Sequence, residues 1–89
     1  MIVIGELRDS VALPDIAGAP VVPAAVVALS AAERQHVGGA ATHKIYIHWR
    51  DDIAPGMRAE ERGETYAVIS SADRDGRQAC LEITAQIQA

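Results

Sequence analysis

The sequence predicts a mainly β fold, a small antiparallel β-barrel with one short helix between the second and third strands. Polar and apolar residues alternate with a period of two through most of the second half of the chain. Turn signals that contain glycine separate these short alternating segments. Such strands suggest a small barrel or a sandwich, and a closed barrel also removes the exposed edges that would invite aggregation.

The chain has 89 residues, and we expect one domain over residues 1–89. Its hydrophobic fraction is 49%, but much of that is alanine, and Phe is absent. Large side chains supply most of the free energy of burial, so the core must be small. A domain of this size is marginally stable alone, which favours added burial against neighbouring subunits.

Charge and cysteine content exclude several function classes. Eight basic and twelve acidic residues give a net charge of −4, so we expect no tight binding of nucleic acid. Cys80 is the single cysteine and lies in a strand pattern, which predicts a buried thiol in a reducing compartment. The apolar run Ile16–Leu29 is short and contains two prolines, so we expect no membrane span. The opening MIVIG has no basic segment and no long apolar stretch, so we expect no leader peptide.

The first strand is expected at Leu7–Leu13, where Pro14 ends it. A loop rich in Gly, Pro and Ala follows over Asp15–Pro23. The second strand is expected at Ala24–Leu29, which contains adjacent β-branched valines.

A short helix is expected at Ala31–Val37. Ser30 and Glu33 form a capping box at its start, and Gly38 and Gly39 occupy the position of a C-terminal cap. A helix of two turns is unstable alone, so we expect it to dock on another surface.

The third strand begins near Thr42. Its alternation places one set of side chains on the inner face, His43, Ile45, Ile47 and Trp49, and another on the outer face, Lys44, Tyr46, His48 and Arg50. Pro55-Gly56 predicts the next turn.

Three more strands complete the barrel. Met57–Glu61 and Glu64–Ser71 are joined by a tight turn at Arg62-Gly63, and Tyr66 and Val68 should face the same way. Asp73–Gly76 predicts a hairpin turn. The final strand alternates Ala79, Leu81, Ile83, Ala85 and Ile87 with Cys80, Glu82, Thr84, Gln86 and Gln88.

The chemistry-bearing residues do not form an expected site. His43 and His48 would point to opposite faces of one strand, and no zinc motif is present. Neighbouring acids such as Asp51-Asp52 and Glu60-Glu61 do not face each other across a cleft. We therefore expect no catalytic residue, no cofactor and no metal, and a protein that is not an enzyme.

The sequence resembles the head-tail joining family, also called head closure or stopper proteins, of tailed-phage necks and gene transfer agents. The matching residues come in the family's order: Gly5, Leu7, Arg8, Val11 and Leu13; Leu29, Ser30 and Glu33; Thr42, His43, Ile45, Ile47 and Arg50; Ile53, Pro55, Gly56, Met57 and Arg58; Gly63, Tyr66 and Val68; Leu81 and Ile83. The chain departs from the family pattern in lacking a Trp before the second strand and in carrying His48-Trp49 where Arg or Tyr is common.

This resemblance implies a structural neck protein assembled in the bacterial cytoplasm into a virion or phage-like particle. It implies a homo-oligomeric ring of about twelve copies between portal or adaptor proteins and the tail, with DNA as passing cargo. In that family a loop can enter the channel and close it, and by position the candidate segment here carries Ser30, Glu33, Arg34, Gln35 and His36. A helix that plugs one end of the barrel is the structural alternative for this segment.

Candidate contacts with other subunits or partners are Tyr46, Trp49, Arg50 and Arg58. Aromatic residues and Arg are favoured at protein interfaces. The alternative function is a small SH3-like or OB-like barrel that binds a peptide or nucleic acid. An OB-like reader needs aromatic residues on a basic face, which Trp49 with Tyr46 supports only weakly.

Overall fold

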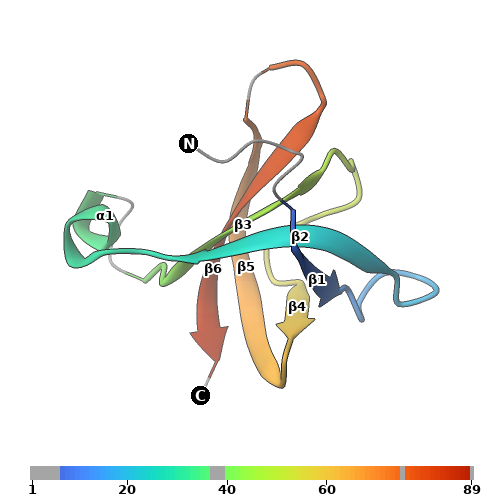
Figure 1. Cartoon of the computed structure of the whole chain (residues 1–89), viewed down its shortest axis with the longest axis horizontal. Helices are drawn as coiled ribbons and strands as arrows, with labels where there is room; N and C mark the ends of the chain where they lie inside the picture. Colours follow the sequence, from blue (N-terminus) through green and yellow to red (C-terminus); the bar gives the residue numbers. More distant parts are fainter. Residues whose placement is uncertain (1–6, 37–39, 75, 89) are drawn as a thin grey trace.

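A computed structural model describes residues 7–36, 40–74 and 76–88 of the chain. Six strands and one helix follow in order: β1 (Asp9–Ala12), β2 (Val21–Ala28), α1 (Ala31–His36), β3 (His43–His48), β4 (Arg58–Glu61), β5 (Glu64–Asp73) and β6 (Cys80–Gln88). The strands are antiparallel to their neighbours and close a barrel in the order β1-β2-β3-β6-β5-β4 (Figure 1). The predicted fold class, with its one helix between the second and third strands, is confirmed.

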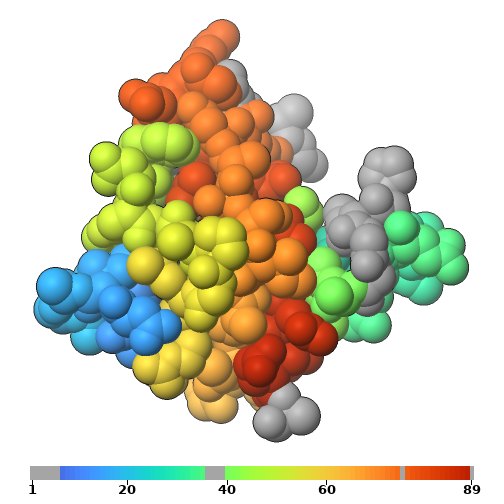
Figure 2. All heavy atoms as spheres, turned by 180° about the vertical axis from the view of Figure 1, so that it is seen from behind, coloured from blue at the N-terminus to red at the C-terminus, as the bar shows by residue number. Residues whose placement is uncertain are grey.

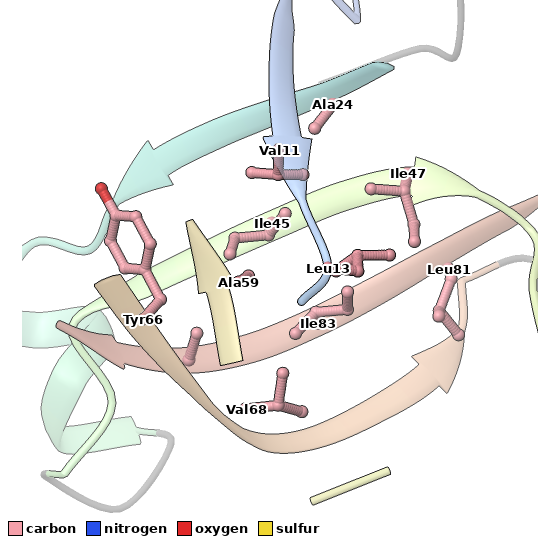
Figure 3. Packing of buried hydrophobic residues seen from close by; sticks show 11 residues of the cluster. Val11, Leu13, Ala24, Ile45, Ile47, Ala59, Tyr66, Val68, Leu81 and Ile83 are labelled. Carbon is pink, nitrogen blue, oxygen red and sulfur yellow. The ribbon is translucent and has the colours of Figure 1, made fainter. Parts of the chain in front are cut away.

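The core lies inside the barrel and draws on all six strands (Figure 3). Its members are Val11, Leu13, Ala24, Ile45, Ile47, Ala59, Tyr66, Val68, Leu81, Ile83 and Ala85. Three of them are alanines, which occupy little of the interior. The middle of each predicted inward set is confirmed, because Ile45, Ile47 and Ile83 are each fully buried. Ala79, at the start of the last set, is exposed, whereas Cys80 of the opposite set is buried.

The first two strands differ from their predicted bounds. β1 is shorter than the predicted strand Leu7–Leu13. β2 begins at Val21 and so includes Pro23, which the sequence pattern assigned to the preceding loop. Pro23 pairs with Ser10 of β1, whereas β3 begins to pair with β2 at Ala24. The first residues of β2 thus have a strand on one side, and there the missing amide of a proline is tolerated.

The turn predicted at Arg62-Gly63 is present as expected, whereas the turn predicted at Asp73–Gly76 is part of a longer connection. At Arg62-Gly63 both residues have positive φ, 51° and 81°, as a tight hairpin of this type requires. Asp73 opens the next connection as predicted, because its carboxylate accepts from the amides of Gly76 and Gln78 at 3.1 and 2.8 Å. This connection continues to Ala79, where β6 has not yet begun, and so is longer than the predicted turn. Asp75, part of that predicted turn, lies outside the described residues.

Helix α1 ends at His36 in the described chain. The predicted last helical residue, Val37, and the predicted cap glycines, Gly38 and Gly39, lie outside the described residues. At six residues, α1 is far too short to cross a membrane. No other helix in the described residues is long enough to do so.

Candidate functional site: a projecting helical segment

The predicted capping box starts helix α1. The Ser30 amide donates to Glu33 Oε1 at 3.1 Å, and the Glu33 amide donates to Ser30 Oγ at 3.2 Å. The hydrogen bonds from Ser30, first its amide and then its hydroxyl, lower the pKa of Glu33. The box therefore keeps the carboxylate ionised and satisfies two amides that the helix cannot pair internally.

Helix α1 does not dock on the barrel of its own chain, so the described residues do not provide the surface on which we expect it to dock. Residues Ala31–Gln35 are all exposed, and the helix stands out to one side of the strands (Figure 1). The structure therefore does not support a helix that plugs the barrel end. We call Ser30–His36 the projecting segment. The side chain of His36 is outside what the structure describes.

The barrel is closed beneath the projecting segment. The Leu29 amide donates to the Thr42 carbonyl oxygen at 2.9 Å, which ties together the two ends of the excursion between β2 and β3. Leu29 and Ala41 are buried on either side of it. The segment is thus an outgrowth whose position does not determine the packing of the core.

His43 stands at the root of the projecting segment. Its ring meets Tyr66 edge-on with 4.9 Å between ring centroids, and its Nδ1 lies 2.8 Å from Thr42 Oγ1. The same hydroxyl accepts from the Ile87 amide at 2.7 Å. Burial lowers the pKa of His43, and the charge of Arg34 lowers it further, so we expect the ring to be neutral at neutral pH.

Tyr46, a predicted contact residue, lies on the outer face of β3 within a group of side chains. The Arg74 guanidinium sits 4.9 Å from the centre of its ring. Lys44 and Glu82 pair beside it at 2.9 Å. Burial raises the pKa of Tyr46, and Glu82 raises it further. Tyr46 is therefore partly covered by its own chain.

The other three predicted contact residues lie toward the end of the barrel where β3 ends and β4 begins. Trp49 is half-buried and packs against the core from just beyond β3. Arg50 makes two hydrogen bonds to Asp52, at 2.9 and 2.8 Å. The guanidinium of Arg58 pairs with Asp15 at 2.9 Å, and the same carboxylate accepts from the Arg58 amide at 2.8 Å.

The predicted site residues therefore fall into separate regions. The projecting segment leads into the start of β3, whereas Trp49, Arg50 and Arg58 flank the connection between β3 and β4. Sequence reasoning missed the partners Asp15 and Arg74. Asp15 and Arg58 are 43 positions apart, so no local pattern relates them.

Acidic residues gather where the β4–β5 hairpin meets β1. Arg62 pairs with Asp9 at 3.0 Å, while Glu61 Oε2 is buried and accepts no hydrogen bond from the described residues. Burial raises the pKa of Glu61, and the charge of Asp9 raises it further. In the described part of the chain, His, Cys, Asp and Glu form no group of three or more that could hold a metal ion.

No curated protein matches the chain significantly. The family model described as phage head completion protein matches residues 11–88, from β1 to the end of β6. That span contains the barrel except for the first two residues of β1, together with the projecting segment and the four predicted contact residues. The chain therefore belongs to the phage head completion protein family and has a structural role in the phage head.

Proposed function

We propose that this protein is the neck component that closes the phage head, forming a ring between the portal or adaptor proteins and the tail. The family match over residues 11–88 carries this proposal, because it covers β2 to β6 in full and the second half of β1. The protein acts through assembly and not through catalysis. Its net charge of −4 disfavours trapping of DNA that passes through the ring.

In this proposal the projecting segment faces the channel and helps retain DNA. Ser30, Glu33, Arg34, Gln35 and His36 are the residues assigned to it. The support is its exposure together with the Leu29–Thr42 hydrogen bond at its base. A capped helix on a closed barrel can change position without loss of the core, as an opening and closing element requires.

Tyr46, Trp49, Arg50 and Arg58 are assigned to contacts with the proteins above or below the ring. Arg50 and Arg58 are each held by a carboxylate of the same chain, which fixes the direction of the side chain before a partner arrives. Such pre-ordering reduces the entropy lost on binding.

The test is association with the portal complex of the same phage. The purified chain is mixed with the purified portal complex, with and without its adaptor, and the mass of the particles is measured by mass photometry over a range of salt concentrations. We expect a discrete added mass that corresponds to a ring. Failure to associate with either preparation at any salt concentration would contradict the neck assignment.

A further inference from the structure

Thr42 joins the ends of three strands at the root of the projecting segment. Its amide donates to the Ala85 carbonyl oxygen of β6, and its own carbonyl oxygen accepts from the Leu29 amide just after β2, both at 2.9 Å. Its hydroxyl accepts from the Ile87 amide at 2.7 Å. Figure 2 shows this place from behind, with the end of β6 in dark red beside the start of β3 in green and α1 beyond them. The contacts of one residue therefore hold the segment to this end of the barrel.

The His43 ring uses the remaining hydrogen-bonding capacity of the Thr42 hydroxyl. Nδ1 of His43 lies 2.8 Å from Thr42 Oγ1, and a hydroxyl that accepts from an amide still has its own hydrogen to donate. A neutral ring with its hydrogen on Nε2 accepts that hydrogen at Nδ1, so two hydrogen bonds run from Ile87 through Thr42 to His43. The edge contact with Tyr66 holds the ring in this position, and the phenol stays uncharged because burial raises the pKa of Tyr66.

A second proton on His43 reverses the hydrogen bond to Thr42. An imidazolium donates from both nitrogens, so Nδ1 no longer accepts the hydroxyl hydrogen. Thr42 Oγ1 must then accept from Nδ1 and from the Ile87 amide together, while its hydrogen loses its acceptor in a half-buried place, which costs free energy. Protonation therefore weakens the tie between β6 and the residue that anchors the segment.

The charges around His43 act on the projecting segment in the same direction. Arg34 of α1 is the cation whose charge opposes protonation of the ring, and Glu64 of β5 is the anion whose charge favours it. β2 and β6 place Ala28 and Ala85 beside His43 and add no charge there. A charged ring is thus repelled by the segment and attracted toward β5.

We propose that His43 is a pH-sensitive switch at the root of the projecting segment. The neutral ring holds the Thr42 hydroxyl and keeps the segment tied to the end of β6, whereas the protonated ring releases it. This inference goes beyond the proposed function and does not depend on it, because it concerns contacts within one chain.

The release belongs to mildly acidic pH. Burial, and after it the charge of Arg34, lowers the pKa of His43, so the folded protein binds this proton less readily than the unfolded chain does. The tie is therefore complete above 6.5, the ordinary pKa of histidine, and is lost as the pH falls through the lower pKa of the folded state.

The test is a titration of the full chain from about pH 8 to about pH 5, followed by NMR. The Cε1 proton of His43 reports the charge of the ring, and the amide signals of Leu29 and Ile87 report the two ties. We expect both amide signals to shift with the midpoint of His43. Their protection against hydrogen exchange, corrected for the intrinsic rate, should fall by a factor of about 3–10, as for the loss of one hydrogen bond.

Four variants identify the titrating group and its link to the segment. His43→Phe keeps an aromatic ring that cannot be protonated, so the shift of both amides should disappear. Thr42→Val keeps the shape of the side chain without its hydroxyl, so His43 should still titrate while the Ile87 amide no longer follows it. His48→Gln, at the exposed end of β3, is the matched control and should leave the titration unchanged. His36→Gln, within the segment, should leave it unchanged as well.

Amide signals of Leu29 and Ile87 that do not follow His43 in the unaltered chain would overturn the inference, and so would an unchanged titration of these amides in His43→Phe. Loss of the titration in His36→Gln would also overturn it, because the histidine of the segment would then be the cause. If circular dichroism shows that His43→Phe does not fold, Thr42→Val decides, since an Ile87 amide that still follows the ring in that variant contradicts the proposed link.

Discussion

At the scale of single residues, polar side chains in this protein mainly form hydrogen bonds with backbone amides and hold other side chains in place. Ser30 and Glu33 pair as their spacing predicts, because both groups lie within one helical turn. Asp15 makes contacts that its position in the sequence does not predict. Its carboxylate accepts hydrogen bonds from both the guanidinium and the amide of Arg58. That pairing depends on two loops meeting in space and could not be predicted from the sequence.

Glu61 is the residue whose ionisation should oppose folding. Its pKa in the folded protein is raised above the ordinary value, so the native state holds the proton more tightly than the unfolded chain does. Stability is then greatest below the ordinary pKa and is lost as the pH rises through the pKa of the folded state. Glu61→Gln should raise the free energy of unfolding at about pH 7 by about 0.5–1 kcal/mol, because it removes a partly buried charge that lies beside Asp9 and whose Oε2 accepts no hydrogen bond from the described residues.

The measurement is urea unfolding of both proteins at about pH 7 and about pH 4. The gain should shrink at the lower pH, where the unaltered carboxyl is itself largely protonated. Glu60→Gln, in which the altered side chain is exposed, is the control and should leave stability unchanged. An equal gain at both pH values would show that ionisation is not the cause.

At the scale of elements, α1 and the barrel should respond differently to substitution. Ser30→Ala removes the cap and should let the helix fray, which raises amide exchange at residues 33–35. Because the helix does not pack on the strands, the midpoint of thermal unfolding should stay the same.

Ile83→Ala removes a fully buried side chain of β6 and should lower the free energy of unfolding by about 2–5 kcal/mol.

Hydrogen exchange followed by mass spectrometry, together with calorimetry, checks both expectations. A clear fall in the melting midpoint of Ser30→Ala would mean that the helix is coupled to the core after all. Ser70→Ala, at an exposed position of β5, serves as the neutral comparison.

The strands themselves were largely predictable because the alternation of apolar residues identifies a buried face wherever the outer face is polar. β3 and β6 follow this rule closely. β2 does not, since it is apolar on both faces, and its start was therefore placed three residues late. The docking of α1 was predicted from the instability of isolated short helices, but the described chain gives the helix no surface to cover.

At the scale of the whole molecule, the barrel is a closed body from which one segment projects. Replacing residues 31–36 with a Gly-Ser linker of the same length should leave the barrel folded, because the Leu29–Thr42 hydrogen bond closes it independently. On the proposed function, such subunits should still join the portal complex, yet the heads should lose packaged DNA.

The measurement is the amount of nuclease-resistant DNA in purified heads, with circular dichroism and portal binding as checks on folding and assembly. Arg77→Ala, at an exposed position in the connection before β6, is the control and should retain DNA. Full retention of DNA in the linker variant would remove the channel role from the projecting segment while leaving the ring intact.

The sequence by itself determined the class of the fold, the inward-facing side chains and the cap of the helix, because each depends on spacings of a few residues along one element. It also determined the family resemblance, which the match over residues 11–88 confirms. The tertiary structure decided that the helix stands clear, that Asp15 holds Arg58, and that β2 and β5 lie on opposite sides. These features depend on how strands close into a barrel, and closure joins residues that no local spacing connects.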